Sequence, residues 1–218
     1  MHHDLEVLAD TPAVARAGAA FVADAARKAV AARGRFTFAV SGGHTPWAMF
    51  AELASEDVPW AEVVLYQVDE RVAPAEDPDR NLHHLTEAIG AAPARVVPMP
   101  VDEDDLAAAA ASYGAALPGA FDLVHLGLGP DGHTASLVPD DPVLAVSDRL
   151  VALTRPYQGR VRMTLTYPAL ARAQQLLWLV TGADKVEPLG RLLAGDTGIP
   201  AGRVVAGASL VLADASAT

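Results

Sequence analysis

The feature that most constrains the fold is a series of short, continuously apolar segments that alternate with helical segments along the chain. Residues 63–69 (VVLYQVD), 121–129 (FDLVHLGLG) and 175–182 (QLLWLVTG) are the clearest of these segments. A strand with one face in water alternates apolar and polar residues, whereas a strand buried on both faces is apolar throughout. The pattern therefore predicts an α/β fold, in which helices cover both faces of a mostly parallel sheet.

The remaining elements follow from helical periodicity, capping residues and turn residues. Thr11, with Pro12 at the first helical position, is expected to cap the longest helix. No linker, repeat or low-complexity tract interrupts the pattern, so we expect residues 1–218 to form one domain. Strands are expected at 35–40, 63–69, 121–129, 150–154, 161–166, 175–182 and 209–213, and helices at 11–33, 46–55, from 81 onward, 102–117 and 184–193.

Composition and charge narrow the class of ligand. The chain has no cysteine, which excludes disulfides and thiolate chemistry. Its net charge of −11 argues against nucleic acid or an anionic membrane as partner, and an anionic ligand would depend on a few local cations. The first ten residues lack the basic start and apolar run of a signal peptide, and no segment is long enough to span a bilayer. We therefore expect a cytoplasmic protein.

Polar segments that follow the expected strands are candidate sites, because ligands of open α/β sheets lie outside the carboxyl ends of the strands. The first is residues 41–46 (SGGHTP), with hydroxyl donors at Ser41 and Thr45. Its glycines, Gly42 and Gly43, let the backbone approach a ligand, and the following helix N-terminus favours an anion. The Walker and GxGxxG patterns are absent. The segment fits either a phosphate-binding loop or a plain glycine-rich turn with a capping residue.

The second polar segment is residues 69–71 (DER), at the end of the strand VVLYQVD. Arg71 offers a fixed cation with a donor fork that suits an oxyanion or a phosphate. Asp69 suits sugar hydroxyls or an imidazole. Three charged residues in this place also fit the start of a solvated loop, so both interpretations stay open.

The third polar segment is residues 127–137 (GLGPDGHTASL), which contains His133. A histidine in a loop at the end of a strand is well placed to act as a general base near neutral pH. Asp131, two residues earlier, is able to hold either the imidazole ring or the substrate. The sequence does not decide whether Asp69 or Asp131 is the partner of His133.

The other histidines and two cations have less specific surroundings. His125 falls inside an expected strand and is expected in the core, while the surface is expected to carry His2, His3, His83 and His84. Arg162, in the strand VRMTLT, and Lys185, after VTGAD, are either surface charges or, together with residues 41–45, parts of a phosphate pocket.

Five motifs, in this order and over nearly the whole chain, resemble those of the 6-phosphogluconolactonases, which are related to glucosamine-6-phosphate deaminases. SGGHTP resembles the family's SGG-x-TP loop, and VDERVAPAEDPDRN its DER-x-VP…SN segment. GLGPDGHTASLVP is similar to the family's G-x-G-x-DGHTASLFP motif, and RMTLT and VTGADK to R-x-TLT and TG-x-x-K. The DGHTASL string is the most specific of these.

The resemblance implies a Rossmann-like fold of the deaminase type and hydrolysis of a sugar-phosphate lactone in the pentose phosphate pathway. His133 would be the base that activates water, Arg71 would stabilise the oxyanion, and Asp69 and Asp131 would position the substrate or the imidazole. No metal or organic cofactor is implied, and the protein would be a monomer or a weak homo-oligomer. The phosphate and the rest of the substrate would be held by Ser41, Gly42, Gly43, Thr45, Arg162, Lys185 and Asn81.

The chain departs from the family pattern in four places. His44 stands where a small polar residue is usual, and Arg80 stands where serine commonly precedes Asn81. VAP replaces VP at residues 72–74, and Val138 replaces phenylalanine. None of these changes removes a proposed catalytic group, but Arg80 leaves the role of its loop open.

Two rival functions remain. Glucosamine-6-phosphate deaminases resemble this chain in several motifs, but they usually carry DEY in place of residues 69–71 and an acidic residue after DGH, where this chain has SLVP (136–139). A non-catalytic sugar-phosphate sensor would usually be attached to a DNA-binding domain. This chain has neither the spare length nor the basic charge for one.

Overall fold

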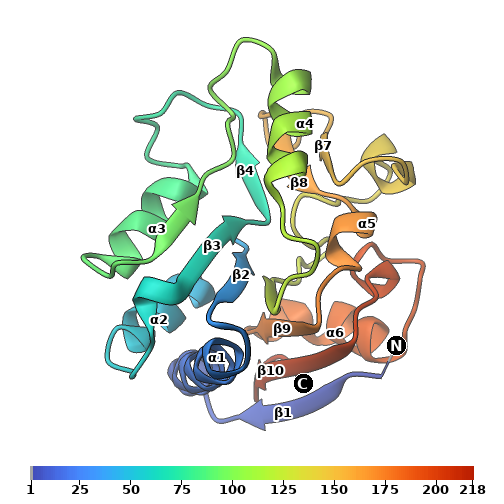
Figure 1. Cartoon of the computed structure of the whole chain (residues 1–218). Helices are drawn as coiled ribbons and strands as arrows, with labels where there is room; N and C mark the ends of the chain where they lie inside the picture. The colour runs from blue at the N-terminus through green and yellow to red at the C-terminus, as the bar shows by residue number, and fades with distance from the viewer. Residues whose placement is uncertain (1) are drawn as a thin grey trace.

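Seven parallel strands form the centre of the protein in the computed structural model, which describes residues 2–218 (Figure 1). The mostly parallel sheet is therefore confirmed, although two of its strands, β1 and β5, were not expected from the sequence. The strand order is β1-β10-β9-β6-β2-β3-β5. The bounds are β1 (Asp4–Leu8), β2 (Phe36–Val40), β3 (Val63–Gln67), β5 (Arg95–Val97), β6 (Leu123–Leu126), β9 (Gln175–Val180) and β10 (Ala208–Asp214).

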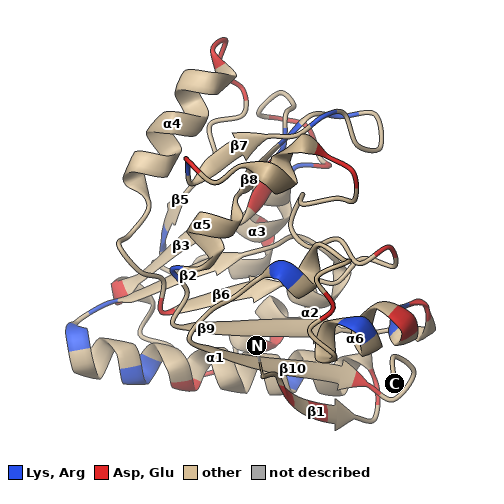
Figure 2. Ribbon diagram, turned by 90° about the vertical axis from the view of Figure 1, so that its right-hand side faces the viewer, with Lys and Arg blue, Asp and Glu red and all other residues tan. Residues whose placement is uncertain are grey.

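Helices cover both faces of this sheet, as the apolar strands predict. Along β9, Leu177 and Leu179 face one core, while Leu176, Trp178 and Val180 face the other. The first core takes its helical residues from α1 (Thr11–Arg33), α2 (His44–Leu53) and α3 (Asn81–Ile89), and the second from α4 (Leu106–Ala116), α5 (Tyr167–Leu170) and α6 (Val186–Leu193). Figure 2 shows that β2, β6 and β9, in the middle of the sheet, carry no charged residue, whereas the edge strands β1 and β5 do.

Four short 3-10 helices complete the helical segments, and no helix within residues 2–218 has the length and apolar character to cross a membrane. The 3-10 helices are η1 (Trp60–Glu62), η2 (Pro142–Ala145), η3 (Ala183–Lys185) and η4 (Ala201–Arg203).

A second sheet of three antiparallel strands, in the order β4-β8-β7, stands beside the carboxyl end of the large one. It contains β4 (Asp69–Arg71), β7 (Val151–Leu153) and β8 (Arg162–Leu165). The sequence pattern predicted one strand over residues 63–69, but the chain changes sheets at Val68. The Val68 N–H donates to the carbonyl of Val40 in β2, and its own carbonyl accepts from Leu165 in β8. An unbroken apolar run therefore serves two sheets in succession.

The N-termini of α1 and α4 differ in detail from the expectation. Asp10, not Thr11, caps α1: its carboxylate accepts the Ala13 N–H at 2.8 Å, and the Thr11 hydroxyl donates instead to Asp214. The helix expected from residue 102 begins at Leu106, because Asp105 accepts the first free N–H groups and acts as the N-cap. The acidic residues before Asp105 therefore precede the helix.

Two histidines lie inside the protein. His3, which was expected on the surface, is buried, and its Nδ1 lies 2.7 Å from the Ser209 hydroxyl of β10. This prediction was wrong because the partner of His3, Ser209, lies 206 residues away in the sequence, and local patterns do not reveal that contact. His125 on β6 is fully buried, as expected. Burial, only partly offset by the Ser41 backbone beside the ring, lowers the pKa of His125 to about 3.

A buried carboxylate, Glu70 of β4, links the second sheet to α3. Its Oε1 accepts the N–H groups of Arg71 and Asn81, and its Oε2 accepts the Leu82 N–H and the Gln67 side-chain amide, all within 2.8 Å. Glu70 is completely inaccessible to water. One side chain thus binds the N-terminus of α3 to the second sheet and satisfies helix N–H groups that would otherwise have no partner.

Replacing Glu70 with glutamine should lower the free energy of unfolding by about 2–4 kcal/mol, because either amide orientation presents an NH₂ group to two donors. Urea unfolding measures this change. The Glu87→Gln substitution on the exposed face of α3 is the matched control, since the Glu87 side chain is 67% exposed. Equal unfolding midpoints for the two variants would contradict the structural role of Glu70.

The burial of His125 predicts acid sensitivity. In the unfolded chain His125 has an ordinary pKa of 6.5, whereas in the folded protein its pKa is about 3. Between pH 6.5 and about pH 3 the unfolded state therefore binds more protons than the folded state. Stability therefore falls as the pH drops through this window, by about 2–3 kcal/mol at roughly pH 4.5. Urea unfolding near neutral pH and near pH 4.5 should show a smaller loss for His125→Leu than for the wild type. The variant His83→Leu, at an exposed site, should lose as much stability as the wild type. If His125→Leu also lost as much stability as the wild type, the argument would be refuted.

Candidate active site

Four strands of the large sheet end beside one cavity. β2, β3, β6 and β9 are parallel, so their carboxyl ends lie at the same edge of the sheet. The order of the strands reverses between β2 and β6, which is where open α/β sheets bind ligands. The cavity has a volume of about 460 Å³. It is lined by ten of the eleven expected site residues: Ser41, Gly42, Gly43, Thr45, Asp69, Arg71, Asn81, His133, Arg162 and Lys185.

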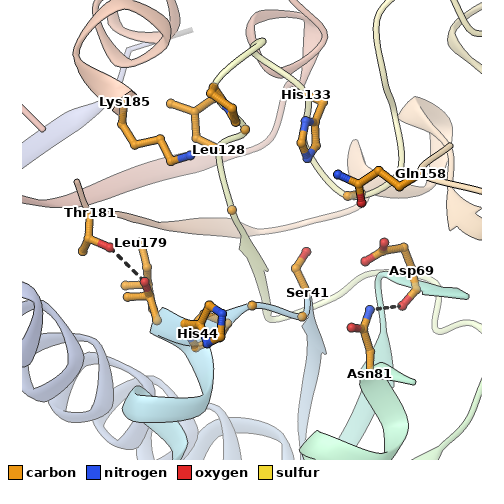
Figure 3. Close-up of a pocket in the computed structure, with 18 of the residues that line it drawn as sticks. Ser41, His44, Asp69, Asn81, Leu128, His133, Gln158, Leu179, Thr181 and Lys185 are labelled. Atoms are coloured by element: carbon orange, nitrogen blue, oxygen red, sulfur yellow. Dashed lines mark hydrogen bonds between the residues drawn. The ribbon is translucent and has the colours of Figure 1, made fainter. Parts of the chain in front are cut away.

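The eleventh residue, Asp131, lies next to His133. Its Oδ1 is 2.5 Å from His133 Nδ1 and also accepts the backbone N–H of His133 at 3.1 Å. Partial burial on its own would raise the pKa of Asp131, but the His133 N–H and the imidazole together hold that pKa below its ordinary value. An ionised carboxylate at Nδ1 favours the tautomer with its proton on Nδ1, which leaves a lone pair on Nε2. Figure 3 shows the His133 ring pointing into the cavity.

Glycines shape the turn that carries this pair. Gly132 has φ of +80°, and a Cβ there would stand 2.6 Å from the Ile199 Cβ. Its carbonyl accepts the Ala201 N–H at 3.0 Å. A Cβ on Gly129 would lie 2.1 Å from His133 Nδ1. The close packing of the imidazole and of the segment around Ile199 on this turn therefore requires glycine at both positions.

Asp69 has a different set of partners from Asp131. Its Oδ2 accepts the Ser136 hydroxyl at 2.6 Å and lies 3.9 Å from a guanidinium nitrogen of Arg162. The question that the sequence left open, which aspartate contacts His133, thus has a geometric answer: Asp131 does. Asp69 lines the cavity but is buried, with 7% of its side chain exposed.

The segment after β2 passes directly into a helix. α2 begins at His44, two residues before the expected start at Pro46, so Gly42 and Gly43 lie just before its free N–H groups. A Cβ on Gly42 would come within 2.1 Å of the Asn81 Oδ1. Ser41 is buried, and within residues 2–218 its hydroxyl has no hydrogen-bond partner. Figure 3 shows Ser41 pointing into the cavity, opposite His133.

Three cations surround the cavity. Arg71 donates to Asn81 Oδ1 at 2.9 Å, and Lys185 Nζ lies 2.7 Å from Asp184 Oδ2. Arg162 donates to Gln158 Oε1 at 3.1 Å, and burial, offset in part by Asp69, lowers its pKa from the ordinary arginine value. The cations come from β4, β8 and η3, and a protein of net charge −11 thereby gathers positive charge at one place.

Several cavity residues were not predicted from the sequence. Tyr157 and Gln158 belong to the exposed connection between β7 and β8, and Thr181 follows β9, where its hydroxyl lies 3.0 Å from that of Thr45 (Figure 3). A single sequence carries no signal for the first two, because nothing in TRPYQGR marks it as facing a site. His44 also lines the cavity.

Arg80, the unusual residue of its loop, does not line the cavity. It is 3% exposed and lies between two carboxylates: Nε is 3.9 Å from Glu70 and a terminal nitrogen is 3.5 Å from Asp102. Arg80 therefore compensates the charge of the buried Glu70 and takes no part in the cavity wall.

Comparisons with known proteins show the family to which the chain belongs. A model of the family described as glucosamine-6-phosphate isomerases/6-phosphogluconolactonase matches residues 9–212. A 6-phosphogluconolactonase from Synechocystis is 38% identical over 181 residues, 77% of this chain and 75% of that protein. One from Mesorhizobium japonicum is 39% identical over 188 residues, 81% of this chain and 79% of that protein.

A solved structure extends the match to the fold. The crystal structure of the 6-phosphogluconolactonase from Thermotoga maritima covers 97% of this chain and 99% of its own, at 25% identity and a TM-score of 0.88. The Rossmann-like arrangement that the motifs implied is thus confirmed. The chain belongs to the glucosamine-6-phosphate isomerase/6-phosphogluconolactonase family.

Proposed function

We propose that this protein is a 6-phosphogluconolactonase, which hydrolyses 6-phospho-D-glucono-1,5-lactone to 6-phosphogluconate in the pentose phosphate pathway. The observation that carries the proposal is the His133–Asp131 pair in a cavity that also holds three cations. This combination suits a substrate with an electrophilic carbonyl at one end and a phosphate at the other. The names of the related proteins support the same activity.

In this mechanism His133 is the general base. Its Nε2 takes a proton from water as the water oxygen forms a bond to the lactone carbonyl carbon. The tetrahedral intermediate then collapses, the bond to the ring oxygen breaks, and the imidazolium returns the proton to that oxygen. Asp131 stabilises the imidazolium through Nδ1. Such a base contributes a factor of about 10²–10⁴ to the rate.

Arg71 stabilises the oxyanion that forms during attack. Asn81 holds its guanidinium at 2.9 Å, and Glu70 fixes both residues through their backbone N–H groups. Donors placed in advance need no reorganisation when the charge develops, which is why they are effective in catalysis. Asp69, held by Ser136, positions Arg162 and a hydroxyl of the sugar.

The 6-phosphate binds at the start of α2, where Ser41, Gly42, Gly43 and Thr45 offer hydroxyl and backbone donors. The helix N-terminus favours an anion, and Lys185 and Arg162 add full positive charges. The unpartnered Ser41 hydroxyl suits a phosphate oxygen. The proposal includes a cytoplasmic location and needs no metal or organic cofactor, because a δ-lactone is already reactive toward water.

Proton release on addition of freshly made 6-phosphoglucono-δ-lactone, with spontaneous hydrolysis subtracted, tests the activity and its base together. His133→Ala should reduce kcat about 10²–10⁴-fold, because the general base is lost. His83→Ala, an exposed histidine on α3, is the control and should retain wild-type turnover. Near-normal turnover in His133→Ala would remove His133 from the mechanism. If the wild type releases ammonia from glucosamine 6-phosphate and no protons from the lactone, the protein is a deaminase.

Lys185→Ala should raise KM roughly 10-fold to 100-fold with little change in kcat, since one charge-assisted contact to the phosphate is worth about 1.5–3 kcal/mol. Initial rates over a range of lactone concentrations separate the two constants. Lys28, which is 77% exposed on α1, supplies the matched control, Lys28→Ala. A KM equal to that of the control would show that Lys185 does not bind the phosphate.

A further inference from the structure

The connection between β7 and β8 forms a tight hairpin beside the cavity. The backbone N–H and carbonyl of Tyr157 pair with the carbonyl and N–H of Arg160, at 2.9 and 3.2 Å. The two residues between them, Gln158 and Gly159, have φ of +52° and +80°, as a type I′ turn requires. Left-handed backbone is unfavourable for a residue other than glycine, so other contacts must hold Gln158 there.

Those contacts join the hairpin to the segment between β4 and α3. Arg160 lies 2.6 Å from Asp77 and 3.6 Å from Asp79, and the Val72 N–H donates to the Val161 carbonyl at 3.0 Å. The hairpin therefore has a fixed position although most of it is exposed. Its first residue, Tyr157, is half-buried and lines the cavity.

The Tyr157 ring touches two groups of the proposed mechanism at once. Its centroid is 5.7 Å from that of the His133 ring at an angle of 64°, an edge-to-face contact. The Arg162 guanidinium carbon lies 5.3 Å from the same Tyr157 centroid, within the range of a cation–π interaction. One aromatic ring thus contacts both the imidazole and a cation assigned to substrate binding.

The imidazole needs such a contact. Asp131 holds His133 at Nδ1 only, and among residues 2–218 no hydrogen bond holds Nε2. The Asp131 hydrogen bond and the packing on Gly129 hold the Nδ1 side of the ring, and the Tyr157 ring adds a separate contact to the imidazole.

We propose that Tyr157 is a positioning residue, whose ring fixes the plane of the His133 imidazole and its separation from the Arg162 guanidinium. This inference rests on the proposed function in so far as His133 is the base. The ring acts, not the hydroxyl: no hydrogen bond of the Tyr157 hydroxyl is present within residues 2–218, and burial and the nearby Asp131 raise its pKa, which keeps the phenol neutral.

The test compares Tyr157→Leu, which removes the ring, with Tyr157→Phe, which keeps it. Tyr157→Leu should lower kcat roughly 10-fold to 100-fold, since misplacement of a reacting group by about 1 Å has an effect of this size. Its KM should rise as well, because Arg162 loses its support. Tyr157→Phe should restore most of the wild-type kcat. Trp60→Leu, which removes a half-buried ring of η1 far from the carboxyl ends of the strands, controls for a general loss of packing and should leave kcat unchanged.

A second readout does not depend on activity. The ring current of Tyr157 shifts the Hε1 resonance of His133 in the proton NMR spectrum, which His133→Ala identifies by its disappearance. Without any substrate, this resonance should move in Tyr157→Leu and stay in place in Tyr157→Phe and Trp60→Leu. Wild-type kcat and an unmoved resonance in Tyr157→Leu would overturn the role of Tyr157 and leave the lactonase function intact. Absence of lactonase activity in the wild type would refute the function, while the resonance would still test the contact.

Discussion

The burial of one ionisable side chain, Glu70, is the constraint on which the arrangement of the site depends. A carboxylate without access to water is tolerated only where donors satisfy both oxygens, and Glu70 has two donors on each. Two of these donors are the backbone N–H groups of Arg71 and Asn81, so the same bonds place both side chains. Asn81 in turn occupies the space that a side chain at Gly42 would need. The cation proposed to stabilise the oxyanion and the loop proposed to bind the phosphate therefore share one support.

The three cations of the cavity differ in the groups that lie beside them. Asp69 and Asp184 lie beside Arg162 and Lys185, so each of these cations has a neighbouring carboxylate even without substrate. Arg71 instead contacts a neutral amide. A phosphate dianion must compete with Asp184 for Lys185, whereas Arg71 is available to a developing oxyanion. This difference suits the roles proposed for them: ground-state binding for Lys185 and transition-state stabilisation for Arg71.

The sequence was informative where physical constraints act locally. Apolar strands such as QLLWLV predicted a sheet covered on both faces, and parallel strands necessarily bring the segments that follow them to one edge, so ten of eleven expected residues share a cavity. The sequence was uninformative where tertiary contacts determine the local structure. The change of sheet at Val68 depends on hydrogen bonds to β2 and β8, and the hairpin of Tyr157 depends on Arg160 and Asp77. β1, whose residues are mostly exposed, lacks the continuous apolar run of the buried strands.

The position of β1 has a consequence for how the sheet assembles during translation. β1 precedes the other strands of the sheet in the sequence, yet its neighbour is β10, which follows them in the sequence and lies between β1 and β9. During translation, β1 leaves the ribosome before its partner strand β10 exists. About two hundred further residues must be made before the two strands are able to pair. His3 meets Ser209 only at that point. The large sheet is thus completed only after β10 has been made, because β10 separates β1 from every other strand of that sheet.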